Sequence, residues 1–128
     1  METKIISPER EIYKGIAEMV VVPGEDGDFS AMIEHAPFIT YLRPGKLEVI
    51  ENEKSKNIYF VGGGFAKVSD NRCVIMVDYI KNILDIDLKA NKQKISMLKD
   101  KINQSINDLD KKIILDEISI LETENDLT

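Results

Sequence analysis

Cysteine, histidine and long apolar runs are scarce in this 128-residue sequence. No apolar run approaches the ~20 residues that a membrane-spanning helix needs, so any contact with a membrane is expected to pass through a partner. The single cysteine, Cys73, cannot form an internal disulfide. Its place in the apolar run CVIMV predicts a buried, reduced thiol in a cytosol-like compartment. Residues 1–15 contain no apolar segment of the signal-peptide kind, so we expect no signal peptide.

Basic residues are in the minority. Lysine and arginine number 17 against 23 aspartates and glutamates, which gives a formal net charge of −6. Phosphate binding needs clustered cations, so this balance argues against a nucleic-acid partner. The apolar fraction of 43% predicts a packed core, and the length leaves room for one full domain with a small appendage.

The only histidine, His35, lies far from Cys73 in the sequence. A zinc site needs three or four histidine, cysteine or carboxylate ligands at suitable spacing. A cysteine nucleophile needs an exposed thiol together with a base and an orienting group. The sequence offers neither set, so we predict no metal site and no catalytic site. We interpret His35 as a residue that hydrogen-bonds the backbone in the bend made by Ala36 and Pro37.

Three consecutive glycines occupy positions 62–64. A phosphate-binding Walker loop would continue into Gly-Lys-Ser/Thr, and a dinucleotide fingerprint would lead into a helix. The sequence VGGGFAKVSD does neither. We therefore expect these glycines to let strands bend or approach closely at a corner.

The first two-thirds of the chain has the pattern of β-structure. Short runs rich in β-branched residues are separated by turn-forming residues, which is typical of a sandwich or barrel. One run alternates apolar and polar residues, as a strand with one wet face should. Two others, AEMVVV and CVIMV, are continuous, so we expect strands covered on both sides. The predicted strand runs are 4–6, 17–22, 46–51, 57–61 and 72–78.

Apolar residues adopt a helical period beyond about residue 85, and no Gly or Pro occurs after Gly64. Two short helices joined by a tight turn are predicted, with Asn107 or Asp108 as the cap of the second. Each helix has an apolar stripe to cover, against the other helix or against a partner. The first stripe is Leu88, Ile95, Leu98, Ile102, Ile106 and Leu109, and the second is Ile113, Ile114, Ile118 and Leu121.

Glu25, Asp26 and Asp28 cluster on one predicted turn between strands. Acidic residues are abundant in this chain, so any single pair of carboxylates carries little information. The cluster is either a solvated hairpin tip or an acidic contact for a basic partner surface, and the residues alone leave both open.

Residues 22–50 combine a Gly-x-x-Gly turn, a His-Ala-Pro bend and a Leu-x-Pro-Gly turn in the sequence VPGEDGDFSAMIEHAPFITYLRPGKLEVI. This order resembles the signature of the epsilon subunit of F-type ATP synthases. Residues 58–78, IYFVGGGFAKVSDNRCVIMVD, are similar to that family's later segment, in which a glycine cluster precedes a hairpin. The resemblance is strong over residues 15–80 and looser beyond 85, where the helical tail begins as the family's does.

The resemblance implies a mostly β protein: a flattened β-sandwich of about ten strands at residues 1–84, then a C-terminal antiparallel two-helix hairpin at 85–128. In that family the subunit has no active site and no cofactor that the chemistry requires. It is a rotor part of the central stalk, binds the gamma subunit and the c-ring, and helps couple proton flow to ATP synthesis. A bacterial member would be peripheral, on the cytoplasmic face of the inner membrane. The rival interpretation is a free-standing β-sandwich that binds a ligand or partner, with a dimerising tail.

Carried onto this sequence, the resemblance implies an acidic c-ring contact at Glu25, Asp26, Asp28 and Phe29. The bend would lie near the ring and gamma contacts, at His35, Ala36 and Pro37. In the family, basic side chains on the second helix help it dock against the beta subunits and inhibit ATP hydrolysis. From residue 108 onward this chain has seven acids and only two bases, so we expect weak inhibition, or inhibition that rests on the apolar face alone.

Some bacterial epsilon subunits bind ATP through an Ile/Leu-Asp-x-x-Arg-Ala motif at the start of the first helix. Ile86 and Asp87 fit that motif, but Ala90 stands where the arginine belongs and Lys89 comes one residue early. One residue turns a helical side chain by about 100°, and lysine lacks a forked guanidinium. We therefore expect ATP binding no tighter than roughly millimolar, and we interpret Asp87 as a helix cap.

Overall fold

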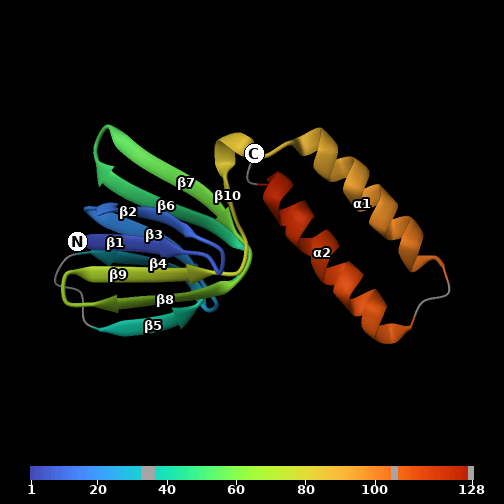
Figure 1. Cartoon of the computed structure of the whole chain (residues 1–128), viewed down its shortest axis with the longest axis horizontal. Coiled ribbons are helices and arrows are strands. Elements are labelled where there is room, and N and C mark those ends of the chain that lie inside the picture. Colours follow the sequence, from blue (N-terminus) through green and yellow to red (C-terminus); the bar gives the residue numbers. More distant parts are fainter. Residues whose placement is uncertain (33–36, 105–106, 127–128) are drawn as a thin grey trace. The chain divides into compact units, whose positions relative to one another are not determined.

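The chain divides into two compact units, Met1–Ile83 and Leu84–Thr128, in the computed structural model (Figure 1). The structure describes residues 1–32, 37–104 and 107–126. Ten strands in two sheets make up the first unit, and two α-helices dominate the second. The predicted architecture, a ten-strand sandwich followed by a two-helix hairpin, is therefore confirmed.

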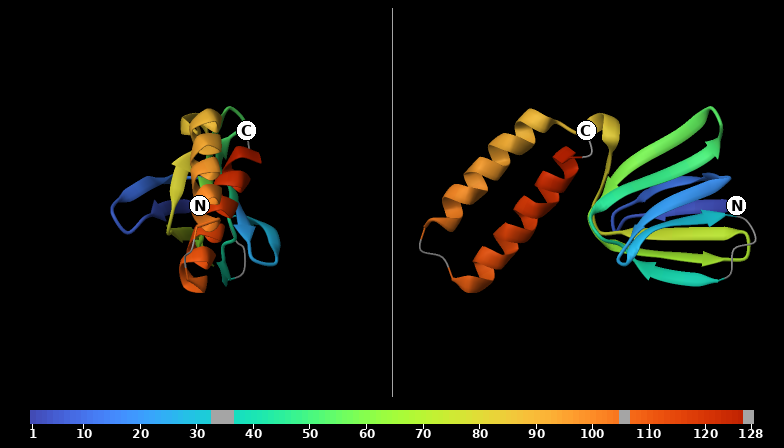
Figure 2. Two further views of the ribbon diagram at one scale, coloured as in Figure 1. Left: turned by 90° about the vertical axis from the view of Figure 1, so that its right-hand side faces the viewer. Right: turned by 180° about the vertical axis from the view of Figure 1, so that it is seen from behind.

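Two five-stranded sheets form the sandwich (Figure 2). The first sheet has the order β2-β1-β9-β8-β5, in which β1 and β9 are parallel and all other neighbours antiparallel. The second sheet, β10-β7-β6-β3-β4, is antiparallel throughout. The first sheet comprises β1 (Glu2–Ile6), β2 (Glu11–Ile16), β5 (Phe38–Tyr41), β8 (Gly64–Ser69) and β9 (Arg72–Val77). The second comprises β3 (Met19–Gly24), β4 (Gly27–Met32), β6 (Gly45–Asn52), β7 (Ser55–Val61) and β10 (Ile80–Asn82).

Inward-facing side chains of both sheets form one apolar core. Along β9, Cys73 and Ile75 are buried whereas Met76 is exposed, because successive residues of a strand face opposite sides. Burial of Cys73 confirms the prediction for this thiol, and it raises the pKa of the thiol to about 11. The expectation that the two continuous apolar runs are covered on both sides is wrong. Val21 and Val74 are only half-buried, since each sheet packs on the core with one face only.

The glycine cluster marks a corner of the sandwich. Gly64, at the start of β8, has a φ of 125°, and a side chain there would collide with the carbonyl oxygen of Met76. Only glycine tolerates both the dihedral angle and the close approach. The predicted role of these glycines is confirmed.

A hydrogen bond joins the two sheets at one side of the sandwich. The Tyr13 hydroxyl on β2 donates to Glu51 Oε1 on β6 at 2.5 Å, and the Ser55 hydroxyl donates to the other carboxylate oxygen at 3.2 Å. Burial and the adjacent Glu51 carboxylate raise the pKa of Tyr13 above its usual range. The phenol therefore remains protonated, and remains a donor, at neutral pH.

The second unit is an antiparallel helical hairpin (Figures 1 and 2). A short 3₁₀ turn, η1 (Ile83–Asp85), precedes α1 (Leu88–Ile102), and α2 (Asp108–Asp126) follows. An apolar cluster from both helices holds them together, and two ion pairs, Lys94–Glu117 at 3.5 Å and Lys99–Glu122 at 3.6 Å, cross between them. The cluster is Ile95, Leu98, Ile118 and Leu121, flanked by Ile102 and Ile114.

Side chains cap both helices as predicted. Asp87 Oδ1 accepts a hydrogen bond from the Ala90 amide at 3.0 Å at the start of α1. Asn107 Oδ1 accepts one from the Asp110 amide at 2.8 Å at the start of α2. Each bond satisfies an amide that has no partner within the helix. Of the two candidates for the second cap, Asn107 is the correct one.

The predicted apolar stripes are only partly correct. Leu88, Leu109 and Ile113 are exposed rather than packed between the helices. For Leu88, a strict spacing of seven drifts by about 20° per heptad around a straight helix, so the end of its stripe leaves the contact face. Leu109 also belongs to α2, not to the first helix. Ile106 lies outside the described residues.

Candidate protein-interaction surfaces

A two-residue turn between β3 and β4 presents Glu25 and Asp26 to solvent. Gly24 pairs with Gly27, whose φ of 137° lies in the region that favours glycine. Neither acidic side chain forms an ion pair within the described part of the chain. We call residues 24–28 the acidic turn. Its tip is a compact negative charge that can attract a basic partner.

Asp28, the third predicted ring-contact acid, lies in an ion pair. Arg43 Nη2 donates to Asp28 Oδ1 at 2.5 Å, and Arg43 Nη1 donates to the Gly24 carbonyl oxygen at 2.5 Å. The charge of Asp28 is thus compensated within the chain, unlike the charges at the tip of the turn. Sequence reasoning missed Arg43, because nothing in the sequence pattern places it against this turn.

The other predicted contact residues have different surroundings. Phe29 is half-buried, stacks on Phe38 with ring centroids 4.3 Å apart, and packs against the sandwich core. It therefore holds β4 against the core. Pro37 is exposed, whereas His35 and Ala36 lie outside the described residues.

A row of apolar side chains crosses four strands on the outer face of the first sheet. The strand register places Tyr41 beside Phe65, Phe65 beside Met76, and Met76 beside Ile6. Tyr41 is 68% exposed and Met76 43% exposed, and Ile39 nearby is 61% exposed. We call these five side chains, Ile6, Ile39, Tyr41, Phe65 and Met76, the apolar row. Adjacent exposed apolar side chains of this kind mark contact surfaces more often than isolated ones do.

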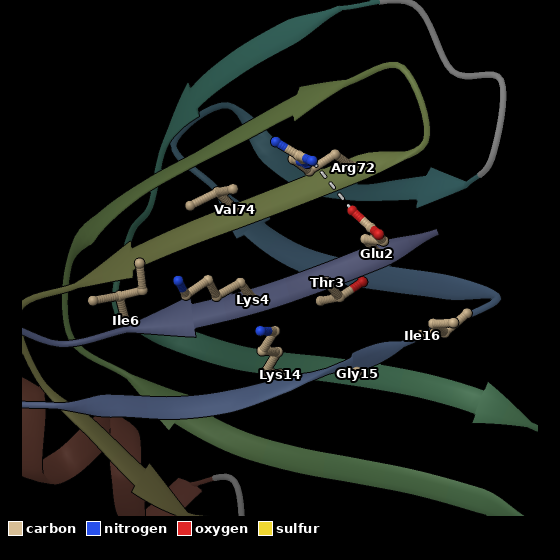
Figure 3. Close-up of a pocket in the computed structure, with 9 residues that line it drawn as sticks. All are labelled: Glu2, Thr3, Lys4, Ile6, Lys14, Gly15, Ile16, Arg72 and Val74. Carbon is tan, nitrogen blue, oxygen red and sulfur yellow. Dashed lines mark hydrogen bonds and ion pairs between the residues drawn. The ribbon is translucent and has the colours of Figure 1, made fainter.

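A row of cations lies next to the apolar row on the same face. The register aligns Lys67 with Val74, Val74 with Lys4, and Lys4 with Lys14. We call the three lysines the basic row. Figure 3 shows Lys4 and Lys14 close together at a hollow of about 560 Å³, which an ion pair between Glu2 and Arg72 also borders. Lys4 forms an ion pair with Glu11 at 4.0 Å, whereas Lys14 and Lys67 form none within the described part of the chain. Lys14 and Lys67 are therefore better placed than Lys4 to meet an acidic partner.

Residues 1–83 match the family model described as ATP synthase, Delta/Epsilon chain, beta-sandwich domain. An ATP synthase epsilon chain from Rhodospirillum rubrum is 34% identical over 110 residues, which cover 86% of this chain and 82% of that relative. The chain belongs to the ATP synthase epsilon-chain family. An epsilon chain from Leptospira borgpetersenii is 41% identical over 96 residues, or 75% of each chain. The resemblance inferred from the sequence is confirmed.

Solved structures agree on the fold of this epsilon-family chain. A chain in a mitochondrial ATP synthase structure from Euglena gracilis superposes with a TM-score of 0.82 at 21% identity, covering 98% of this chain and 80% of its own. A chain in the central stalk and c-ring structure of the Tetrahymena thermophila mitochondrial ATP synthase gives a TM-score of 0.70 at 18% identity, covering 100% and 96%. At such identities the likeness shows the fold alone.

The degenerate nucleotide motif of this epsilon-family chain has a local structural use. The Asp87 carboxylate caps α1 through the Ala90 amide, Lys89 is exposed and Ile86 is half-buried. The expectation of ATP binding no tighter than roughly millimolar remains a prediction. Over residues 1–32, 37–104 and 107–126, no group of three or more His, Cys, Asp or Glu could hold a metal ion. None of the described helices is long and apolar enough to cross a membrane.

Proposed function

We propose that this chain is a non-catalytic rotor subunit in the central stalk of a proton-translocating F-type ATP synthase, where it helps couple proton flow to ATP synthesis. Family membership carries the proposal, because the alignment with an epsilon chain spans most of both proteins. The chemistry of ATP synthesis would then take place on other subunits. The chain would be peripheral, on the cytoplasmic face of a bacterial inner membrane, and would meet that membrane only through the complex.

The outer face of the first sheet is the surface that we assign to the gamma subunit. Its apolar row would be desolvated by a large protein partner, which is the main source of favourable free energy in such contacts. The basic row beside it would set orientation by facing acidic side chains. Among the described surfaces, this face joins exposed apolar side chains on neighbouring strands to a row of three lysines, of which Lys4 is paired with Glu11.

The acidic turn is the surface that we assign to the c-ring. Glu25 and Asp26 project without an ion-pair partner in the described part of the chain, and they lie at one end of the β3–β4 hairpin. Charges of this kind steer association and fix register more than they add affinity. The acidic turn would therefore face basic loops of the ring.

The hairpin is the part that we assign to contacts with the alpha and beta subunits. α2 exposes Leu109, Ile113 and Leu115, which supply an apolar contact surface. Its net charge, however, is negative, so an acidic segment of a beta subunit would repel it. Weak inhibition of ATP hydrolysis is the result we expect.

Equilibrium binding of the purified chain to gamma tests the first of these assignments. Met76→Glu should raise the Kd at least about tenfold, because it would leave an unpaired carboxylate in an apolar contact. Met32→Glu is the matched control, since Met32 is 51% exposed on a strand of the second sheet. Equal losses for both variants, or no loss for Met76→Glu, would contradict the assignment. A free-standing binding module would show no affinity for gamma at all.

A further inference from the structure

The acidic turn is tied to the segment that follows β5. The Arg43 backbone amide donates to the Pro23 carbonyl oxygen at 2.9 Å. The guanidinium of the same residue adds contacts to the Gly24 carbonyl oxygen and to the Asp28 carboxylate, both at 2.5 Å. Pro23 and Asp28 are partners in the β3–β4 ladder. One residue therefore holds both strands where they enter and leave the turn.

This arrangement suits arginine and does not suit lysine. A guanidinium carries a planar fork of donors that can reach two acceptors at once, whereas an ammonium is a point charge on a flexible stem. The side chains of Arg43 and Asp28 are 41% and 66% exposed, so Coulomb attraction between them contributes little on its own. The main effect is geometric, because two fixed bonds restrict the turn.

The acidic turn has reasons to be mobile without this restraint. Glu25 and Asp26 are adjacent like charges that repel each other. Gly27 follows them with a φ of 137°, and a glycine in the unrestrained chain has access to many other conformations. A loop that must be ordered on binding loses part of the interaction free energy to that ordering.

We propose that Arg43 is a positioning residue that presets the acidic turn for a basic partner surface, and that Asp28 is the anchor of Arg43 and not itself a partner contact. This inference rests on the proposed docking of the turn on the c-ring, and it divides the acids by role. Glu25 and Asp26 attract the partner, while Asp28 and Arg43 fix the direction in which those two acids point.

Amide hydrogen exchange on the free full-length chain tests the restraint without any partner. The Glu25 amide donates to the Tyr41 carbonyl oxygen at 2.8 Å, and Arg43→Gln should speed its exchange about tenfold by loosening the turn. Arg43→Lys should show most of the same increase. Arg10→Gln, an exposed arginine elsewhere, is the matched control. If Arg43→Gln folds poorly, the exchange rate of the Glu25 amide is measured in Asp28→Asn, which removes the ion-pair partner of Arg43. Unchanged Glu25 exchange in both the Arg43→Gln and Asp28→Asn variants overturns the proposal.

Binding of the chain to membranes that contain the c-ring but lack this subunit tests the positioning role. The charge effect and the positioning effect of an Arg43 substitution predict affinity changes of opposite sign. Arg43→Gln makes the acidic turn more negative, so charge alone would tighten its binding to a basic surface. Positioning predicts the opposite, a loss of about threefold or more, because the turn must be ordered on binding. Arg43→Lys, which keeps the charge, should also lose affinity.

Tighter or unchanged binding of Arg43→Gln overturns the positioning role. Asp26→Asn should weaken binding and flatten its dependence on salt, because it removes a charge that faces the partner. The double variant Asp28→Asn/Arg43→Gln removes both charges of the ion pair, keeps the net charge of the turn, and should leave the salt slope unchanged. A flattened slope for this double variant would make Asp28 a direct contact and would also overturn the proposal. If the wild-type chain does not bind at all, the proposed c-ring docking fails, and the exchange experiment still decides whether Arg43 restrains the turn.

Discussion

A side-chain hydrogen bond from Tyr13 to Glu51 joins the two sheets, and it forms only while the Tyr13 phenol is protonated. The neutral phenol is the donor, and both burial and the Glu51 carboxylate raise its pKa. A group whose pKa is higher in the folded state than in the unfolded state stabilises the fold fully below the unfolded value. That contribution is lost as the pH rises through the folded value. The loss therefore begins above about pH 10, where tyrosine ionises in an unfolded chain.

Tyr13→Phe should lower the free energy of unfolding by about 1 kcal/mol at pH 7, since a half-exposed hydrogen bond to a carboxylate is worth about that much. The difference from wild type should narrow at pH 11, where unfolding frees the wild-type phenol to ionise. Urea unfolding of both proteins at the two pH values measures this. A difference that is equal or larger at pH 11 would show that the phenol does not carry the effect.

Among the elements, the strands with runs rich in β-branched residues were predictable and the others were not. Residues 46–51, 57–61 and 72–78 match β6, β7 and β9 closely. The residue patterns did not mark β2 or β4, whose sequences, EIYKGI and GDFSAM, mix charged, small and apolar residues. Such strands owe their conformation to partners across the sheet, and propensity alone does not show this.

The interaction surfaces depend on register between strands that are remote in sequence. The apolar row needs Met76 to pair with both Ile6 and Phe65, and the sequence does not state that β1 lies parallel to β9. Each strand alternates correctly on its own, but a slip of one residue would turn every side chain to the other face. The acidic tip was predictable because its residues are adjacent. The contacts of Arg43 with Gly24 and Asp28 were not predictable.

The cap of α1 gives a test of the hairpin as an element. Asp87→Ala should cost about 1 kcal/mol of local stability, because the Ala90 amide loses its acceptor. Hydrogen exchange in the first turn of α1 should then speed up, with little change in the sandwich. Asp100→Ala, an exposed acid within the same helix, is the control. Equal effects of both variants would assign the change to lost charge and not to capping.

At the scale of the whole molecule, we expect the two units to have different roles. The sandwich has its own core and carries both proposed rotor surfaces, whereas the hairpin has a separate cluster and an acidic second helix. Between residues 108 and 128 the net charge is −5. This charge opposes docking on an acidic partner, so the hairpin should inhibit ATP hydrolysis only weakly. The sandwich should couple proton flow to ATP synthesis.

Removing residues 108–128 tests the regulatory half of this division. ATP hydrolysis by the assembled complex should rise by less than about twofold, because repulsion already disfavours the inhibitory contact. The rate is measured before and after the deletion at equal complex concentration. A large activation would show that the exposed apolar side chains of α2 inhibit strongly despite the charge.

The most direct test of the central claim is proton-driven ATP synthesis by membrane vesicles depleted of the epsilon subunit. We predict that adding this chain restores synthesis in proportion to the amount that binds. Met32→Glu should restore it equally well, and Met76→Glu should require at least about tenfold more protein for the same rate. Vesicles that neither bind the wild-type chain nor regain synthesis would contradict its role as a rotor subunit.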